Sequence, residues 1–171
     1  MLYLLRHLVA ITALPGMVVI VIPLYLARRF DVVARAPAGL AEALGCAIGV
    51  MAFVIGLALF AASLYHFASH GRGTLGPWDP PRRLVVRGPY RFVRNPMISG
   101  VMFVLVAEAL VLRSPPHAAW AAIAIVMNVG WIVLFEERGL AARFGEEYEE
   151  YRRHVPRFVP RMTPWTRDFR S

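Results

Sequence analysis

The chain has 171 residues, of which 58% are hydrophobic and only 18% are charged. A soluble domain of this length is usually less apolar, so the composition disfavours a soluble enzyme and favours a membrane protein. The formal net charge of +8 is carried by arginine, since the chain has no lysine. Because these arginines cluster between the apolar runs, we expect them to meet lipid headgroups, and nucleic acid is not an expected partner.

Four apolar runs follow one another along the chain. They are Leu8–Ala27, Ala43–Tyr65, Pro96–Leu112 and Ala118–Phe135, and only the third contains a charged residue, Glu108. A helix needs about 20 apolar residues to cross the hydrocarbon core of a bilayer. The sequence therefore predicts an all-α integral membrane protein with about four transmembrane helices, forming a single membrane domain over 1–171. A buried soluble core is the alternative.

The first run also has features of a signal peptide, because Arg6 precedes an apolar stretch. It continues well past Pro15 and Gly16 without a short polar cleavage region, so we expect a retained span. Pro15 and Pro23 should kink this helix, which a bundle tolerates when neighbouring helices satisfy the freed carbonyl groups.

The arginines predict the orientation of the chain in the membrane. With four spans, the N-terminus, the connection 66–95 and the C-terminal tail share one side and hold most of the arginines. The opposite side holds Arg28, Arg29, Arg35 and Arg113. The positive-inside rule then places both termini in the cytoplasm, with the spans in the cell inner membrane.

The connection from His66 to Asn95 is long for a link between two helices, and loops of this length are usually functional or disordered. Its aromatic residues and prolines argue against disorder. The stretch "GPWDPP" at 76–81 predicts a stiff turn, with Trp78 at the level of the lipid headgroups.

The tail carries the pattern of one more helix. Leu140, Phe144, Tyr148 and Tyr151 recur at spacings of four, four and three, which places them on one helical face. Glutamates and arginines occupy the other face. We therefore expect the fourth span to run into a C-terminal amphipathic helix that Pro156 ends.

Three weaker motifs are open to structural explanations. The stretch "GRGTLG" at 71–76 matches a dinucleotide-binding pattern, but no strand precedes it, so that function is not expected. His66 and His70 have a spacing that can hold a metal, yet no third ligand is evident, so we expect interfacial histidines and no metal. Cys46 is expected to serve packing.

Glu108 is the one ionisable residue inside an apolar run, which makes it a functional candidate. It lies close to Arg113 in sequence, so its carboxylate could instead reach the far interface. Pairing with a polar group such as Asn128 of the next span is a further alternative.

The most polar and most rigid turn of the chain is "RGPYRFVRNPMISG", residues 87–100, at the start of the third run. Pro96 suits the first turn of a helix, and Asn95 has the residue type of an N-cap. A helix N-terminus attracts anions through its free N–H groups. Arg91 and Arg94 could add forked donors to a carboxylate or phosphate, or could simply face lipid headgroups.

Three blocks together carry a family resemblance: "GPYRFVRNPMISG", the glutamate pair at 136–137, and "FGEEYEEYRRHVPRFVP" in the tail. In this order, with membrane helices between them, they resemble the isoprenylcysteine carboxyl methyltransferase family, which includes bacterial membrane methyltransferases and phospholipid methyltransferases. The resemblance covers about residues 70–165, the expected cofactor-binding core, whereas the two N-terminal spans in 1–69 match only in being apolar.

The resemblance implies transfer of a methyl group from S-adenosylmethionine to an amphipathic or lipid-like substrate at the cytoplasmic membrane face, with membrane lipids around it. Arg94 and Glu137 are the implied catalytic residues, Glu137 as a base for a neutral nucleophile. A solvated Glu136–Glu137 face paired with residues such as Arg143 is the alternative. The implied cofactor-binding residues are Leu84, Val85, Tyr90, Arg94, Asn95, Pro96, Met97, Ile98, Gly100 and Glu136.

Two departures from the family pattern leave other functions open. The family's histidine is Asn95 here and its tyrosine is Ile98, and an asparagine cannot act as a base near neutral pH. The first alternative is a nicotinamide-dependent membrane reductase of similar architecture, although such an enzyme would want the missing proton donor. The second is a non-catalytic membrane protein that retains the fold. The sequence predicts neither the substrate nor the oligomeric state.

Overall fold

The computed structural model describes residues 12–70 and 83–166, and all regular structure in these ranges is helical. The early positions of the first apolar run and the "GRGTLG" and "GPWDPP" stretches lie outside the described residues. Helix bounds are η1 Thr12–Val21, α2 Ile22–Arg29, α3 Leu40–His70, η2 Gly88–Arg91, α4 Pro96–Leu112, α5 Pro115–Trp131, η3 Ile132–Glu136, α6 Glu137–Phe144 and α7 Glu146–His154.

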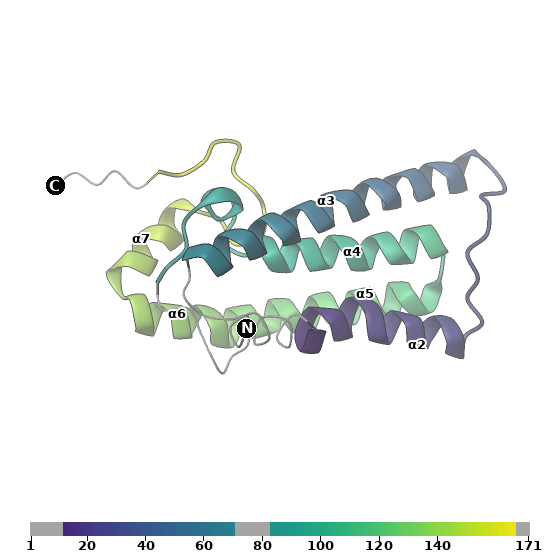
Figure 1. Cartoon of the computed structure of the whole chain (residues 1–171), viewed down its shortest axis with the longest axis horizontal. Coiled ribbons are helices and arrows are strands. Elements are labelled where there is room, and N and C mark those ends of the chain that lie inside the picture. The colour runs from purple at the N-terminus through teal and green to yellow at the C-terminus, as the bar shows by residue number, and fades with distance from the viewer. Residues whose placement is uncertain (1–11, 71–82, 167–171) are drawn as a thin grey trace.

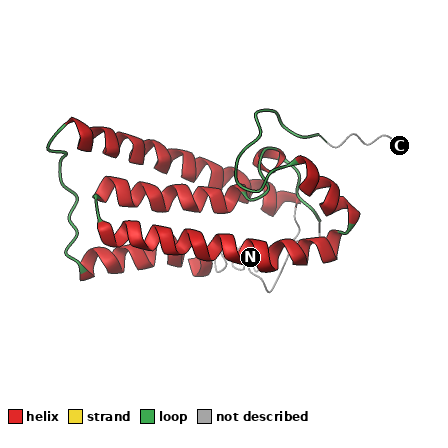
Figure 2. Ribbon diagram, turned by 180° about the vertical axis from the view of Figure 1, so that it is seen from behind, coloured by secondary structure: helices red, strands yellow, loops and turns green. Residues whose placement is uncertain are grey.

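The helices form an elongated bundle with two different ends (Figure 1). Helices α3 and α4 run side by side in opposite directions, and α5 returns along α4 beside α2. Because α5, η3 and α6 are continuous, the chain leaves the bundle at the end where α3 stops and α4 begins. The connection after α3, the start of α4 and the whole tail therefore meet at this polar end, as the view from behind also shows (Figure 2).

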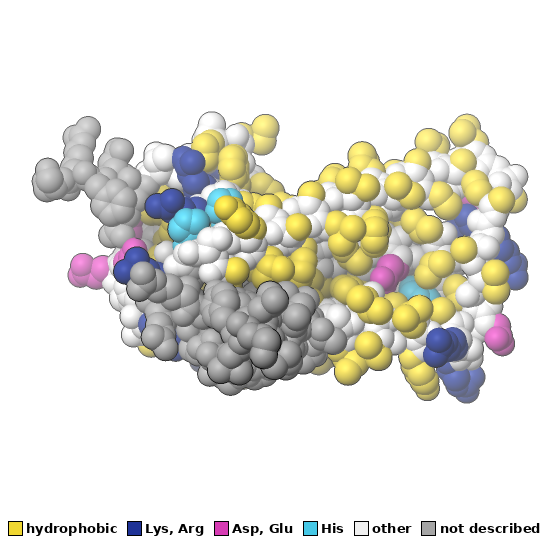
Figure 3. Space-filling view, viewed as in Figure 1, with side chains coloured by type: hydrophobic (Ala, Val, Ile, Leu, Met, Phe, Trp, Pro, Cys, Tyr) yellow, Lys and Arg dark blue, Asp and Glu magenta, His cyan; other side chains and the backbone are white. Residues whose placement is uncertain are grey.

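Two continuous helices among the described residues are long and apolar enough to cross a membrane, Leu40–His70 and Pro115–Phe144. Their most apolar windows have mean hydropathies of 2.5 and 2.1, and only 17% of each window is buried. A core helix of a soluble protein would be mostly buried, so this exposure favours association with a membrane. Hydrophobic side chains cover most of the visible bundle, whereas arginines gather at its two ends (Figure 3).

The observed bounds refine the predicted spans. Helix α4 begins at Pro96 and ends at Leu112, as the sequence predicts. Its 17 residues span roughly 25 Å, the short end of the range for crossing. The second run is longer than predicted, because α3 extends three residues before Ala43 and five beyond Tyr65. The first run is represented by η1 and α2, which follow each other without a break.

The two prolines of the first run are accommodated by a helix of changed pitch. Residues 12–21 form a π-helix, in which each carbonyl accepts a hydrogen bond from the amide five residues later. The amide that would donate to the Val18 carbonyl belongs to residue 23. Position 23 is proline and has no N–H to give. The indole Nε1 of Trp120 on α5 donates to the Val18 carbonyl instead, at 3.0 Å. This is the neighbouring-helix compensation that the sequence predicted for a proline-containing span.

Helices α3 and α4 approach closely where two glycines face each other. A Cβ atom added at Gly56 would lie 2.8 Å from the carbonyl oxygen of Gly100, and one added at Gly100 would lie 2.7 Å from that of Gly56. Small residues let helix backbones pack this closely within a membrane. Gly100, a predicted cofactor-binding residue, is therefore buried against α3 at this crossing.

We expect Gly56→Ala to destabilise the bundle by about 1–3 kcal/mol, because the new methyl group overlaps the α4 backbone. Gly45→Ala on the same helix is the matched control, since nothing lies within 4 Å of a Cβ there. Alanine has a higher helix propensity than glycine, so the control substitution should be neutral or slightly stabilising. Thermal unfolding in detergent, followed by circular dichroism, measures both. Equal melting temperatures would contradict the close crossing.

Candidate functional site

The candidate site lies at the polar end of the bundle, where three segments meet. The connection after residue 83 leads through η2 to the start of α4, the fourth apolar run ends in η3 and α6, and the tail after α7 returns across the connection. These are the three blocks that carry the family resemblance. The structure therefore brings them together in space, although up to about 70 residues separate them in sequence.

The tail is fixed to the connection by backbone hydrogen bonds. The amide of Arg94 donates to the Pro156 carbonyl at 2.9 Å, and the amide of Arg161 donates to the Phe92 carbonyl at 3.0 Å. Arg91 and Trp165 add a reciprocal pair, since the Trp165 amide and the Arg91 Nε each donate to the other's carbonyl at 2.9 Å. The "RFVRNP" turn is thus held from both sides by residues that follow α7.

A buried carboxylate lies at the centre of this junction. Glu137, at the start of α6, has only 6% of its surface exposed. Arg157 donates to both of its oxygens, from Nε at 2.8 Å and from Nη2 at 2.7 Å. Arg94 reaches the same carboxylate from Nη1 at 2.8 Å. One carboxylate therefore ties together the connection, the start of α6 and the tail.

The surroundings of Glu137 contradict the alternative of a solvated glutamate face. Glu137 is not part of a solvated face paired with Arg143, because its carboxylate is buried between two other guanidinium groups. Arg94 divides its Nη1 between Glu137 and the Tyr148 hydroxyl, which is 3.4 Å away. Its Nε is buried and has no partner among the described residues. The sequence analysis did not predict a role for Arg157. Its position between two prolines in "VPRFVP" was the one local sign of an ordered, functional segment.

Asn95 has a different role from the one its residue type predicts. It precedes α4, but its side chain does not cap the helix. Its Nδ2 donates instead to the Arg157 carbonyl at 3.3 Å. A first turn without a side-chain cap keeps amide N–H groups available for an anionic ligand. Met97 and Ile98, in that turn, are partly exposed, whereas Pro96 is buried.

An aromatic cluster, formed mainly by α7, packs against the segment that leads into the turn. Tyr148, Tyr151 and Val155 are almost fully buried, and Leu84 and Val86 of the connection pack against them. The Tyr151 hydroxyl donates to the Tyr90 carbonyl at 2.7 Å. Burial raises the pKa of Tyr151, so its hydroxyl keeps the proton that this bond requires.

The predicted helical face of the tail belongs to the same cluster. Leu140 and Phe144 pack against Tyr148 and Tyr151. The face is divided between two helices, however, because Gly145 adopts a φ of +52° and separates α6 from α7. Helix α7 ends at His154, two residues before Pro156.

Two predicted cofactor-binding residues from different blocks interact electrostatically. Tyr90 lies in η2, and Glu136 is the last residue of η3. Burial raises the pKa of Tyr90, and the nearby Glu136 carboxylate raises it further, so the phenol stays neutral. The side chain of Glu136 is exposed, unlike that of its neighbour Glu137. An exposed carboxylate whose charge acts on a neutral phenol suits a cationic ligand.

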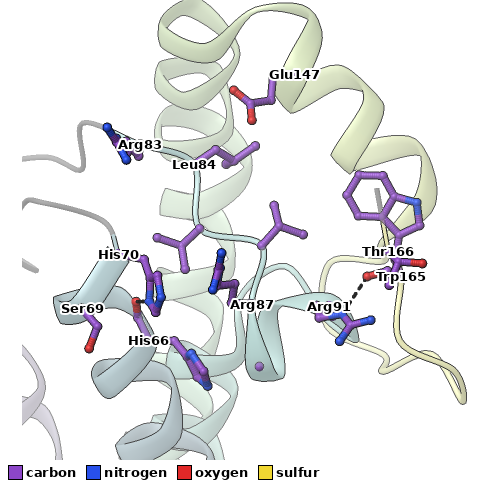
Figure 4. Close-up of a pocket in the computed structure, with 13 residues that line it drawn as sticks. His66, Ser69, His70, Arg83, Leu84, Arg87, Arg91, Glu147, Trp165 and Thr166 are labelled. Carbon is purple, nitrogen blue, oxygen red and sulfur yellow. Dashed lines mark hydrogen bonds between the residues drawn. The ribbon is translucent and has the colours of Figure 1, made fainter. Parts of the chain in front are cut away.

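The other candidate residues are distributed as follows. Leu84 and Val85 lie in the extended segment before η2 and line a cavity of about 830 Å³ that none of the other predicted cofactor-binding residues lines (Figure 4). His66 and His70 also line it, with ring centres 5.9 Å apart. No group of three potential metal ligands occurs within 12–70 and 83–166.

The apolar bundle and its polar junction define a helical, membrane-associated protein whose candidate site residues lie at one end. A family model described as phospholipid methyltransferase matches residues 44–147, which is more than half of the chain. The chain therefore belongs to the phospholipid methyltransferase family. This confirms the resemblance inferred from the sequence motifs, and the matched range includes the turn at 87–100 and the glutamate pair.

Two curated relatives carry methyltransferase names. The chain is 38% identical over 76 residues to methanethiol S-methyltransferase 2 of Bradyrhizobium diazoefficiens, which covers 43% of this chain and 27% of the relative. It is 32% identical over 78 residues to protein-S-isoprenylcysteine O-methyltransferase B of Arabidopsis thaliana, which covers 46% and 40%. The chain thus spans less than half the length of these relatives. No solved structure matches it. These relationships favour a methyltransferase over a nicotinamide-dependent reductase.

Loss of Arg157 tests the buried junction. We expect Arg157→Gln to destabilise the protein by about 1–3 kcal/mol, because Glu137 loses a bidentate partner in a buried place, while Arg94 still compensates part of its charge. Thermal unfolding in detergent measures the effect. Arg153→Gln is the matched control, since Arg153 is an exposed arginine on α7. Similar melting temperatures for the two variants would show that the Arg157–Glu137 ion pair adds nothing to stability.

Proposed function

We propose that the chain catalyses transfer of a methyl group from S-adenosylmethionine to an amphipathic or lipid-like substrate at the cytoplasmic face of the membrane. The observation that carries this proposal is the family match over residues 44–147. It includes both the uncapped start of α4 and the exposed carboxylate of Glu136, which the fold places at the same end of the bundle.

The membrane arrangement is part of the proposal. The η1–α2 segment, α3, α4 and the continuous α5–α6 helix would provide four crossings, with the polar end in the cytoplasm and both termini on that side. The distribution of arginines in the sequence supports this orientation, because most of them fall in the connection and the tail. An inner-membrane location follows from the same reasoning.

The residues at the polar end fit the charges of the cofactor. S-adenosylmethionine carries a sulfonium and an ammonium group, which suit the Glu136 carboxylate and the Tyr90 ring. Its carboxylate suits the amide N–H groups at the start of α4. We propose that Leu84, Val85 and Gly100 shape the surroundings, and that Asn95, Pro96, Met97 and Ile98 line the pocket.

Arg94 and Glu137 act in this proposal mainly by positioning. The Glu137 carboxylate already accepts hydrogen bonds from two guanidinium groups, which leaves it poorly suited to take a proton. Both residues hold the turn before α4 at a fixed distance from η3. The group formed by Arg94, Arg157 and Glu137 also keeps a net positive charge close to the start of α4, because two guanidinium groups share one carboxylate. This charge adds to the attraction for the cofactor's carboxylate.

Methyl transfer of this kind depends on alignment more than on proton transfer. The bound cofactor supplies an activated methyl group, and the protein must hold the nucleophile in line with it at near-contact distance. A carboxylate or thiolate can attack without a base. The names of the two relatives describe transfer to the sulfur of methanethiol and to an oxygen of an isoprenylcysteine protein. We therefore propose a substrate with a carboxyl or thiol group attached to an apolar body.

Cofactor binding is the first test. We expect the purified protein in detergent to bind S-adenosylmethionine saturably in calorimetry, and Glu136→Gln to weaken binding at least tenfold because a carboxylate facing the cationic groups is lost. Glu146→Gln, at an exposed glutamate on α7, is the matched control and should bind normally. NADPH should not compete.

Three outcomes would contradict the proposal. Competition by NADPH would favour the reductase alternative. Absence of binding in a folded sample, with and without extracted membrane lipids, would favour a non-catalytic protein. Binding without transfer of a labelled methyl group to any extracted lipid, carboxylate amphipath or thiol amphipath would remove the proposed activity.

A further inference from the structure

Glu108 is a half-buried carboxyl group in the apolar part of the bundle, and the proposed methyl transfer does not use it. It lies on α4 about 6 Å before that helix ends at Leu112, and therefore far from the turn that precedes the helix. An ionisable side chain within an apolar membrane helix is costly, so it usually has a partner or a function.

The two partners that the sequence suggests for Glu108 are engaged elsewhere. Asn128 donates its Nδ2 to a carbonyl of its own helix at 2.8 Å. Arg113 holds the loop before α3, because its Nη2 donates to the Arg35 carbonyl at 2.7 Å and its Nε lies 3.6 Å from the Glu42 carboxylate. Glu108 itself makes no hydrogen bond or ion pair with any residue that the structure describes. Its carboxyl group is therefore available to a ligand.

An apolar cavity of about 320 Å³ borders Glu108 between α3 and α4. Its lining consists of Val50, Phe53, Ala107, Glu108, Val111 and Leu112, so one ionisable residue stands among five apolar ones. Val50 and Phe53 expose 55% and 41% of their surface, which means that the cavity opens on the outer surface of the bundle. A cavity of this size is large enough for a small ligand.

The chemistry of the lining favours an organic cation. No group of three potential metal ligands occurs in the parts of the chain that the structure describes, so a metal ion is not favoured beside Glu108. An ammonium group offers three N–H donors and one positive charge to a carboxylate. Their attraction is stronger in an apolar environment than in water. The remaining apolar lining requires that the same molecule carry a hydrocarbon body.

We propose that this cavity binds a small lipophilic amine. Its ammonium group pairs with the Glu108 carboxylate, and its apolar body fills the space between Val50 and Phe53 of α3 and Leu112 of α4. Such a ligand contacts both helices near the end of α4 and stabilises the bundle, because it binds the folded protein only. The site is independent of the proposed methyl transfer, since none of the proposed cofactor-binding residues lines it.

The test is a calorimetric titration of the full chain in a non-ionic detergent, with adamantylamine as the probe. Adamantanol has the same hydrocarbon body without the charge, and ethylammonium has the charge with little body. We expect saturable binding of adamantylamine, and binding of the other two probes that is weaker by roughly tenfold or more. Adamantylamine should also raise the melting temperature, because a ligand that binds the folded state stabilises it.

A charge-removing variant tests the role of the carboxylate. Glu108→Gln keeps the size of the side chain and should weaken adamantylamine binding by roughly tenfold or more, because the charged partner of the ammonium group is lost. Its affinity for adamantanol should not change. Glu146→Gln, at an exposed glutamate on α7, is the matched control and should bind adamantylamine normally.

A pair of larger side chains on α3 tests the cavity itself. Val50→Phe should weaken adamantylamine binding by roughly tenfold or more, because the added ring occupies space in the cavity. Val54→Phe is the matched control, since Val54 is exposed on the same helix and does not line the cavity. Both positions are exposed, so both variants should fold.

Four results would overturn the proposal. Equal affinity for adamantylamine and adamantanol, or full affinity in Glu108→Gln, would show that the carboxylate takes no part. Equal effects of Val50→Phe and Val54→Phe would show partitioning over the helix surface. Absence of saturable binding in a folded sample would remove the site. Displacement of adamantylamine by S-adenosylmethionine would assign the amine to the cofactor site. Absence of cofactor binding would instead contradict the proposed methyl transfer and leave the amine site intact, so the two failures are distinguishable.

Discussion

The polar end of this protein depends on one buried carboxylate. Glu137 receives Arg157 from the tail and Arg94 from the turn before α4, at distances of 2.7–2.8 Å. A carboxylate so close to an apolar bundle would be costly alone, and it is tolerated because guanidinium donors satisfy both oxygens. The backbone pairing of the tail with the connection and the aromatic cluster under Tyr90 follow from this junction, because the ion pairs bring these segments into register.

The junction also explains how a long connection and a separate tail can build one site. Hydrophobic burial fixes α3 against α4 through Gly56 and Gly100, but it provides little orientation for polar segments that leave the bundle. Directional hydrogen bonds supply that orientation. Arg157 is effective here because its side chain binds Glu137 while its carbonyl accepts from Asn95, so a single residue sets both sides of the turn.

The sequence predicted local features well and long-range ones poorly. The bounds of α4 followed from Pro96 and from the end of the apolar run before Arg113, and the aromatic face of the tail followed from its spacing. The i→i+5 pitch before Pro23 involves Trp120 on α5, and the Arg157–Glu137 pair joins two separate segments, so neither follows from local spacing. The pattern of apolar and polar residues along the sequence cannot reveal such contacts. The alternative of a solvated Glu136–Glu137 face does not hold for Glu137, whose side chain is buried, although its neighbour Glu136 is exposed.

Asn95 shows how the chain can keep the shape of the turn before α4 without the family's histidine. Its amide donates to the Arg157 carbonyl, so the side chain contributes to the position of the tail and not to capping or proton transfer. The turn is held by this amide and by the guanidinium groups of Arg94 and Arg157 on Glu137, and none of these contacts requires a histidine. The departure therefore costs the site a base but not its geometry. A nucleophile that is already anionic, such as a carboxylate or thiolate, requires only that geometry.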